Sequence, residues 1–274
     1  MKQESLIRNG HAIGMFDSGV GGLTVMHEVM RTLPKESLIY FADTARIPYG
    51  EKSRETIIRY SIENSIFLME KEVKLLVVAC NTASAYALES LRKIFNIPII
   101  GVIEAGAEKA VQKTRNKQIA VLGTRGTVNS GTYQQEIQKR LPGAIIHAIP
   151  CPLLVPMIEE KWIDHPVTKQ VVKEYLDPLK KLHIDTLLLG CTHYPLLRDL
   201  FQAEMGDDVI IVDSASTCAE AVQNTLKAQN LLSPGSGKPD YRYFVTDDPQ
   251  KFKSLSKEFL SIAVDNVLAA SHLH

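Results

Sequence analysis

Residues 75–84, LLVVACNTAS, form a short apolar run that ends at Cys80 and continues into small hydrogen-bonding residues. Residues 186–195, TLLLGCTHYP, repeat this pattern and place Cys191 at the corresponding point. Apolar runs of this length between turn-forming residues predict buried parallel strands, and open α/β sheets bind ligands beyond the carboxyl ends of such strands. A single free cysteine there is often only a small buried hydrophobe. Two at matching strand ends, each followed by polar residues, favour a role in chemistry.

Other landmarks recur in the same order and at nearly the same separation. The matching positions are Ser18 and Thr124, Pro48 and Pro156, and Cys80 and Cys191, which lie 106, 108 and 111 residues apart. Similar separations in one order predict a duplicated unit. A ligand would then lie between the two copies and face one cysteine from each.

The composition of the chain favours a small ligand. Its 274 residues suffice for two domains of ordinary size, and 45% of them are hydrophobic. Lys plus Arg and Asp plus Glu are equal at 31 each, so no net field would hold a nucleic acid or an anionic membrane surface. We therefore expect neither nucleic acid nor membrane as a partner.

The termini and the cysteines predict a cytoplasmic protein. Residues 1–10, MKQESLIRNG, lack the apolar core of a signal peptide, and no run approaches the about 20 apolar residues needed to span a bilayer. None of the four cysteines is in a CxxC spacing, so they are expected to stay reduced. They are Cys80, Cys151, Cys191 and Cys218.

Strand-like and helix-like segments alternate along the chain, which predicts an α/β fold with two similar parallel-sheet domains. Strands are expected at 13–16, 38–42, 75–79, from 99, and at 118–122, 145–149, 186–190 and 209–212, with an edge strand at 241–246. Helices are expected at 25–33, 53–71, 83–95, 105–113, 133–140, 167–181, 218–228 and from 249, and a loop at 124–127. We expect residues 1–99 and 214–274 to form the first domain and residues 100–213 the second, because the last segment crosses back.

Two stripes of apolar residues at helical spacing predict which faces of two helices are buried. The stripe Ile58, Ile62, Ile66 and Met69 is predicted to cover the first sheet. The stripe Phe252, Leu255, Phe259 and Ile262 is predicted to bury the last helix, which Asp248 caps.

The glycine-rich DSGVGG at residues 17–22 does not predict a nucleotide site. A GxGxxG motif would need glycine where the chain has Thr24, and no GxxxxGK[ST] occurs. The start of the following helix can still bind a carboxylate through its backbone amides, with Asp17 and Ser18 facing that opening. A tight turn and an N-cap are equally consistent with these residues.

Two opposed thiols suggest inversion of a stereocentre. A thiolate is a compact base as well as a nucleophile, and two nucleophiles would be redundant. Two bases on opposite faces of one carbon can remove a proton from one side and return it from the other. Asp17 is expected beside Cys80, and Glu159 with His193 beside Cys191. Glu159 and its neighbour Glu160 could also be the solvated end of a short helix, which is the favoured reading for Glu160.

Five segments together resemble bacterial glutamate racemases, within the cofactor-independent aspartate/glutamate racemase superfamily. They are DSGVGGLTV, YFADTARIPYG, VVACNTASA, GTRGTV and LLLGCTHYPLL, and the resemblance extends over nearly the whole chain. It implies two α/β domains related by a pseudo-twofold axis, with the active site in the cleft between them. It also implies interconversion of L- and D-glutamate without pyridoxal phosphate or metal, supplying D-glutamate for peptidoglycan synthesis and so for cell-wall biogenesis and cell shape.

The same resemblance assigns residues. It makes Cys80 the base for D-glutamate and Cys191 the base for L-glutamate, assisted by Asp17, Glu159 and His193. The implied substrate contacts are Asp17, Ser18, Tyr49, Gly50, Asn81, Thr82, Thr124, Thr127, Thr192 and His193. Many relatives carry other residues between the two threonines of GTRGTV, so no role is assigned to Arg125 or Gly126.

Two alternatives remain open. Another cofactor-independent racemase, acting on aspartate or a hydantoin, would share the architecture. A two-lobed amino-acid binding protein would use the cleft only for capture, and exchange of the Cα proton with solvent deuterium would distinguish it. A homodimer is expected, although no residue pattern identifies its interface.

Overall fold

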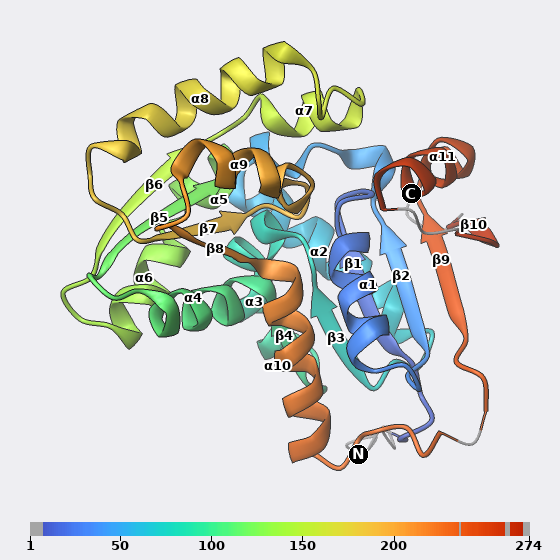
Figure 1. The fold of residues 1–274 in the computed structure, drawn as a ribbon. Coiled ribbons are helices and arrows are strands. Elements are labelled where there is room, and N and C mark those ends of the chain that lie inside the picture. Colours follow the sequence, from blue (N-terminus) through green and yellow to red (C-terminus); the bar gives the residue numbers. More distant parts are fainter. Residues whose placement is uncertain (1–7, 236, 261–263, 271–274) are drawn as a thin grey trace.

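The structure is a computed structural model that describes residues 8–235, 237–260 and 264–270, and it consists of two wholly parallel sheets with helices on both faces (Figure 1). The first sheet has the order β10-β9-β2-β1-β3-β4, and the second has the order β6-β5-β7-β8. This confirms the predicted α/β fold with two similar parallel sheets.

The strands of the first sheet are β1 (Ile13–Asp17), β2 (Leu38–Ala42), β3 (Leu75–Val78), β4 (Ile99–Gly101), β9 (Tyr241–Val245) and β10 (Val267–Ala269). Those of the second are β5 (Gln118–Gly123), β6 (Ile145–Pro150), β7 (Thr186–Gly190) and β8 (Ile210–Asp213). The helices are α1 (Leu23–Thr32), α2 (Arg54–Met69), α3 (Asn81–Ile94), α4 (Val102–Lys113), α5 (Arg125–Asn129), α6 (Thr132–Arg140), α7 (Leu154–Glu159), α8 (Pro166–Lys180), α9 (Arg198–Met205), α10 (Ser214–Ala228) and α11 (Pro249–Leu260). Short 3₁₀ helices are η1 (Thr44–Arg46), η2 (Tyr49–Glu51) and η3 (Tyr194–Leu197).

The two sheets repeat one topology. The order β2-β1-β3-β4 becomes β6-β5-β7-β8 when four is added to each strand number. The central strands are fully buried and apolar except at their ends, where β1 has Asp17 and β7 has Thr186, as expected for parallel strands covered on both faces. Cys80 and Cys191 follow the equivalent strands β3 and β7, so the repeat seen in the sequence is a repeat of the fold.

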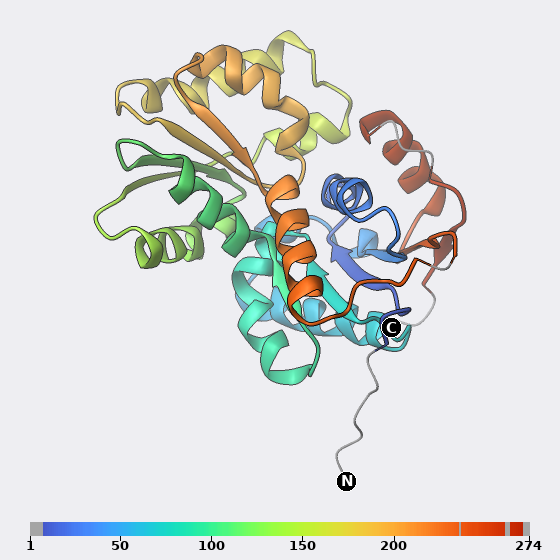
Figure 2. The same ribbon diagram turned by 60° about the horizontal axis from the view of Figure 1, so that its bottom comes forward.

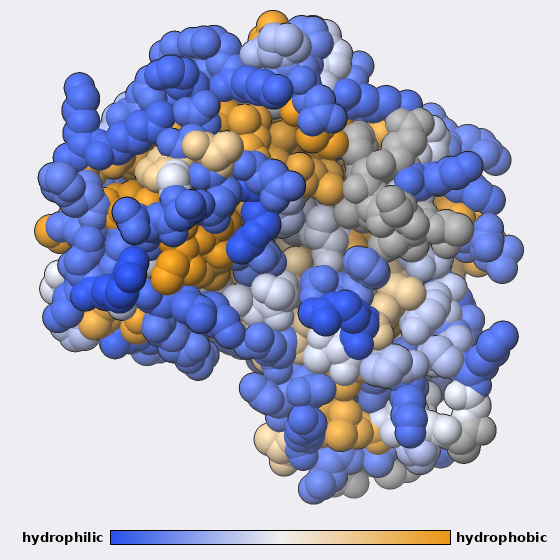
Figure 3. Space-filling view, in the orientation of Figure 1, coloured by the Kyte–Doolittle hydropathy of each residue, from blue (hydrophilic) through white to orange (hydrophobic). Residues whose placement is uncertain are grey.

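Each sheet lies between two layers of helices. On the first sheet, α1 and α10 cover one face, whereas α2 and α3 cover the other. On the second sheet, α4 and α6 cover one face, whereas α7, α8 and α9 cover the other. We call the first sheet with its helices the first lobe, and the second sheet with its helices the second lobe. Figure 3 shows the two lobes as distinct masses with mostly hydrophilic rims.

The chain crosses between the lobes through α4 and α10, which pack against each other. Helix α4 follows a strand of the first sheet but packs on the second, and α10 follows a strand of the second sheet but packs on the first. Figure 2 shows α10 (orange) running between the lobes. We propose 1–99 with 214–274, and 100–213, as the two domains. The boundary after residue 99 falls inside β4, whose Ile100 and Gly101 pair with β3.

The predicted face of α2 is confirmed in part, because Ile58, Ile62 and Met69 pack against the first lobe's core, but the prediction for Ile66 is wrong. Ile66 is 47% exposed, and Ile58 and Ile62 are only partly buried. The fully buried face instead includes Ser61 and Asn64. Arg46 and Tyr49, in the β2–α2 connection, provide hydrogen bonds for Asn64, and spacing along the helix cannot reveal them.

The strand at 241–245 is not an edge strand. It pairs with β2 on one side and with β10 on the other. Phe252 and Leu255 of α11 pack on the first lobe's core, as expected, and Asp248 caps the helix by accepting a hydrogen bond from Lys251 N–H. The side chain of Phe259, and all of Ile262, lie outside the described residues.

Two helices differ from the sequence prediction. The expected loop at 124–127 contains α5, capped by the Thr124 hydroxyl, which accepts from Thr127 N–H. Helix α9 was not predicted. Among the described residues, no helix has the length and hydropathy needed to cross a bilayer.

Candidate active site

A cavity of about 320 Å³ opens between the two lobes at the carboxyl ends of the strands. The first lobe lines it with Ser18, Gly19, Ile47, Pro48, Tyr49, Gly50, Glu51, Cys80, Asn81 and Thr82. The second lobe lines it with Thr124, Cys151, Pro152, Val155, Pro156, Glu159, Glu160, Cys191, Thr192 and His193. The expected substrate contacts therefore line this cavity, except Asp17 and Thr127, which lie behind its surface.

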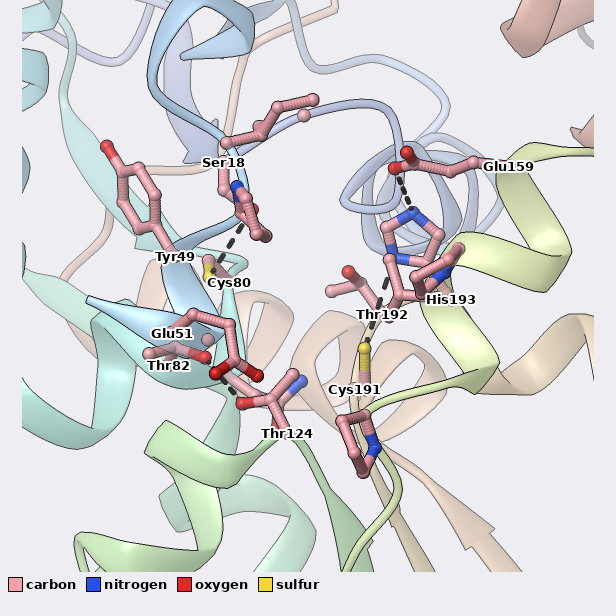
Figure 4. A pocket seen from close by; sticks show the side chains of 18 of the residues that line it. Ser18, Tyr49, Glu51, Cys80, Thr82, Thr124, Glu159, Cys191, Thr192 and His193 are labelled. Atoms are coloured by element: carbon pink, nitrogen blue, oxygen red, sulfur yellow. Dashed lines mark hydrogen bonds and ion pairs between the residues drawn. The ribbon is translucent and has the colours of Figure 1, made fainter.

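The two cysteines lie on opposite walls of this cavity (Figure 4). Cys80 is the N-cap residue of α3, and Cys191 follows β7 directly. Each side chain is only 6% exposed. Two thiols from equivalent strand ends thus face one space that can hold a small molecule.

The Cys80 side of the cavity is acidic. Cys80 Sγ donates to Ser18 Oγ at 3.8 Å. Burial, and then the nearby Asp17 carboxylate, raise the pKa of Cys80 to about 12. Cys80 is therefore a thiol at neutral pH when no ligand is bound.

Asp17 lies beneath the glycine-rich turn, at the end of β1, and is fully buried. Its Oδ1 accepts a hydrogen bond from Gly19 N–H at 2.9 Å, whereas Oδ2 has no partner in the described part of the chain. Burial is the main reason that the pKa of Asp17 rises to about 6. Asp17 thus lies against the turn that leads into α1, beside Cys80, but it does not line the cavity.

The Cys191 side of the cavity carries a chain of three groups. His193 Nδ1 is 3.9 Å from Cys191 Sγ, and His193 Nε2 is 3.1 Å from Glu159 Oε1. Burial lowers the pKa of His193, but the hydrogen bonds and charges of Cys191 and Glu159 outweigh it and raise this pKa to about 10. Burial raises the pKa of Glu159, but His193 lowers it below the usual value. His193 therefore holds a proton between a thiol group and a carboxylate.

Three threonines join the lobes at one wall. Thr82 Oγ1 is 2.9 Å from Thr124 Oγ1 and 3.2 Å from Thr127 Oγ1. Thr127 is 1% exposed, so it contacts the other threonines rather than the cavity. Gly50 packs tightly against Thr124 at the same wall, because a Cβ atom on Gly50 would lie 2.7 Å from Thr124 Cβ.

The Tyr49 hydroxyl points away from the cavity (Figure 4). It donates to Asp43, and it accepts from Asn64 Nδ2 at 3.0 Å. Arg46 binds Asp43 through Nε and Asn64 Oδ1 through Nη2. Tyr49 can therefore present its backbone and ring edge to a ligand, but not its hydroxyl.

Several lining residues were not assigned from the sequence. Cys151 is fully buried at the wall, and Val155 and Pro156 extend that wall. The match between Pro48 and Pro156 in the repeat was a signal for this loop, since both prolines line the cavity. Glu51 and Arg125 form an exposed ion pair between the lobes, with Arg125 Nη1 3.6 Å from Glu51 Oε1. No pattern in the sequence predicted this pair.

Comparisons with known proteins identify the family of this chain. Residues 13–222 match the family described as Asp/Glu/hydantoin racemase, which covers most of the chain. The chain belongs to this family. It is therefore an amino-acid racemase, which is an isomerase. Within the described ranges, no group of three or more histidine, cysteine or acidic side chains is arranged to hold a metal ion.

Individual relatives agree in sequence and in structure. The glutamate racemase of Syntrophus aciditrophicus is 48% identical over 257 residues, which cover 94% of this chain and 95% of the relative. The solved glutamate racemase isoform of Bacillus anthracis aligns with a TM-score of 0.92 at 39% identity, over 95% of this chain and 97% of that one. The glutamate racemase of Francisella tularensis, solved with D-glutamate, gives 0.90 at 38% identity over 96% and 98%.

Proposed function

We propose that the protein interconverts L- and D-glutamate by transferring protons between the substrate and two cysteines. The observation that supports this most is the placement of Cys80 and Cys191 on opposite walls of one cavity. A planar carbanion at Cα between them could accept a proton from either side. The relatives quoted above are glutamate racemases, which favours glutamate over aspartate.

In this proposal the two thiols begin in different protonation states. His193 Nδ1 lies 3.9 Å from Cys191 Sγ, which makes Cys191 the candidate for the first base, while burial and Asp17 keep Cys80 a thiol. Cys191 would then take the Cα proton of L-glutamate, and Cys80 would deliver its proton to the opposite face. The reverse reaction starts from D-glutamate, with Cys80 as the base.

Neutral groups would bind the two carboxylates. The cavity offers hydroxyls and amides from Ser18, Asn81, Thr82, Thr124 and Thr192, as well as backbone N–H groups at the start of α3. Such donors hold a carboxylate without introducing a cation next to the thiols. Circular dichroism of D-glutamate and D-aspartate incubated with the protein tests the choice. Faster loss of the aspartate signal would contradict it.

Single serine substitutions test the two-base mechanism. Cys80→Ser and Cys191→Ser should each fold and bind glutamate, but racemise it about 100-fold to 10,000-fold more slowly, because a hydroxyl is too weak an acid to replace a thiol. With each Cα enantiomer of 3-chloroglutamate, one thiolate can take the Cα proton while chloride leaves Cβ, and the resulting enamine hydrolyses to a keto acid and ammonia. Cys191→Ser should process only the D form and Cys80→Ser only the L form. Near-full racemisation by either variant would show that one base reaches both faces.

The proposal extends to the cell. D-glutamate made here would supply peptidoglycan synthesis, so depletion of the protein should disturb cell shape and be rescued by added D-glutamate. The reaction needs reduced thiols, which suits the cytoplasm. We also propose a homodimer, which light scattering after size exclusion would test.

A further inference from the structure

The turn that carries Cys80 is tied to the second lobe by a tyrosine. Tyr133, in α6, is 1% exposed, and its hydroxyl donates to Asn81 Oδ1 at 2.7 Å. Asn81 directly follows Cys80 and is the first residue of α3. The other end of the Asn81 amide donates to Ser214 Oγ at 3.4 Å. The Asn81 amide is thus held from the second lobe by Tyr133 and from α10 by Ser214.

The turn that carries Cys191 is tied to the first lobe by a threonine. Thr24, in α1, is 8% exposed, and its hydroxyl lies 3.1 Å from the carbonyl oxygen of Thr192. Thr192 directly follows Cys191. The same hydroxyl lies 2.9 Å from Gly21 O, so its proton is shared between the helix and the opposite lobe.

The two ties occupy matching places in the repeat. Each comes from the helical segment after the first strand of one sheet, and each ends on the residue after the cysteine of the other sheet. The turns around them touch closely as well. A Cβ atom on Gly21 would lie 2.4 Å from Thr192 Oγ1, and one on Gly126 would lie 3.0 Å from Thr82 Cγ2. Loop contacts therefore leave little space for either turn to shift.

We infer that Tyr133 and Thr24 are positioning residues, each of which aligns the cysteine of the opposite lobe with the substrate Cα atom. Neither residue is among those that line the cavity. Each acts through the backbone or side chain next to one cysteine. The inference rests on the proposed two-cysteine function, and it assigns Tyr133 to Cys80 and Thr24 to Cys191.

Two nearly isosteric substitutions remove one tie each. Tyr133→Phe keeps the ring, which packs against Gly190 directly before Cys191, and removes only the hydroxyl. Thr24→Val keeps the branched shape and removes its hydroxyl, while Thr24→Ser retains it. Each variant is assayed for racemisation of glutamate and for chloride release from each Cα enantiomer of 3-chloroglutamate, a reaction that needs only one aligned thiol.

The expected result is a crossed pattern. Tyr133→Phe should lower the kcat of elimination from the D form about 10-fold and leave the L form within about 2-fold, because a small misplacement of a base is costly. Thr24→Val should do the opposite, and Thr24→Ser should restore it. Racemisation needs both thiols, so both variants should lose it, with KM changed less than kcat.

Other outcomes overturn the inference. Equal losses for both enantiomers would indicate general damage to the fold, and no loss would show that the ties do not align the thiols. If Tyr133→Phe fails to fold, the Thr24→Val and Thr24→Ser pair decides the question. Cys80→Ser and Cys191→Ser are measured alongside. If those variants fail to separate the enantiomers, the proposed two-base function itself is wrong. If the cysteine variants separate the enantiomers but Tyr133→Phe and Thr24→Val do not, only this inference is wrong.

Discussion

At the scale of single residues, the two cysteines have unequal surroundings despite equivalent positions. Cys80 faces a buried carboxylate, whereas Cys191 faces a histidine that hydrogen bonds to Glu159. A duplicated fold has therefore received two different sets of proton-handling groups. Under the proposed mechanism, this difference would make Cys80 the first acid and Cys191 the first base.

Asp17 should destabilise the fold at neutral pH. Its pKa is raised from 3.8 to about 6, so its contribution to stability is fully present below pH 3.8 and is lost as the pH rises through 6. Asp17→Asn removes the buried charge, and we expect it to raise the free energy of unfolding by about 1 to 3 kcal/mol at pH 8, with little change at pH 3.5. Denaturant titrations at both pH values measure this. A variant that is less stable than the natural protein at pH 8 would contradict the assignment, whatever its effect on activity.

At the scale of elements, α2 packs a partly polar face against the first sheet. Asn64 binds the Tyr49 hydroxyl and the Arg46 guanidinium, and Thr246 Oγ1 donates to Asp43 Oδ1 at 3.2 Å from the end of β9. The network joins the β2–α2 connection and α2 to the end of β9, which is 203 residues away along the chain. It fixes η2, whose backbone lines the cavity, against both a helix and a neighbouring strand.

Removing one hydroxyl from this network should affect binding as well as stability. We expect Tyr49→Phe to lower the free energy of unfolding by about 1 to 2 kcal/mol, because Asp43 and Asn64 lose a buried partner. The KM for glutamate should rise, since η2 loses its anchor. Tyr86→Phe, on α3, is the matched control, because the Tyr86 hydroxyl has no hydrogen bond among the described residues. Equal effects of the two substitutions, measured by thermal unfolding and steady-state kinetics, would rule out the anchoring role.

The central strands and both cysteine turns could be predicted from the sequence, whereas other parts depended on partners that lie far along the chain. Strands β3 and β7 are continuous apolar runs, which is how strands covered on both faces look. The buried position of Asn64 in α2 could not be predicted, because its hydrogen-bond partners are residues of another segment. The prediction that β9 is an edge strand was wrong because its outer neighbour β10 has only three residues, too few to be predicted from the sequence. Helix α9, in contrast, could have been predicted from Phe201 and the terminating Gly206. It follows β7 as α3 follows the equivalent strand β3, so the repeat also indicates a helix there.

At the scale of the whole molecule, the cavity is defined by how closely the lobes approach. Gly50 and Gly126 lie at one contact, and Gly21 at the other. Each glycine faces atoms of the opposite lobe at a distance that leaves no space for a side chain. The separation of the lobes, and with it the separation of the thiols, therefore depends on the absence of a side chain at these three glycines.

Gly50→Ala tests this dependence. The added Cβ atom would lie 2.7 Å from Thr124 Cβ, so the lobes must move apart. We expect racemisation to fall about 100-fold and the free energy of unfolding to fall by about 1 to 3 kcal/mol. Gly10→Ala, where no atom lies within 4 Å of the added Cβ, is the control and should change neither. Racemisation by Gly50→Ala at the rate of the control variant would show that the lobes tolerate a wider separation.

The exchange of α4 and α10 has a consequence for the origin of the molecule. Each sheet is completed by a helix that the other copy of the repeat supplies. Two separate copies of the unit could complete their cores only by trading their last helices, as the subunits of a domain-swapped dimer do. Joining the two genes would preserve that exchange within one polypeptide. The single chain therefore has the architecture of a fused, reciprocally swapped pair, and the cavity between the lobes corresponds to the interface of such a pair.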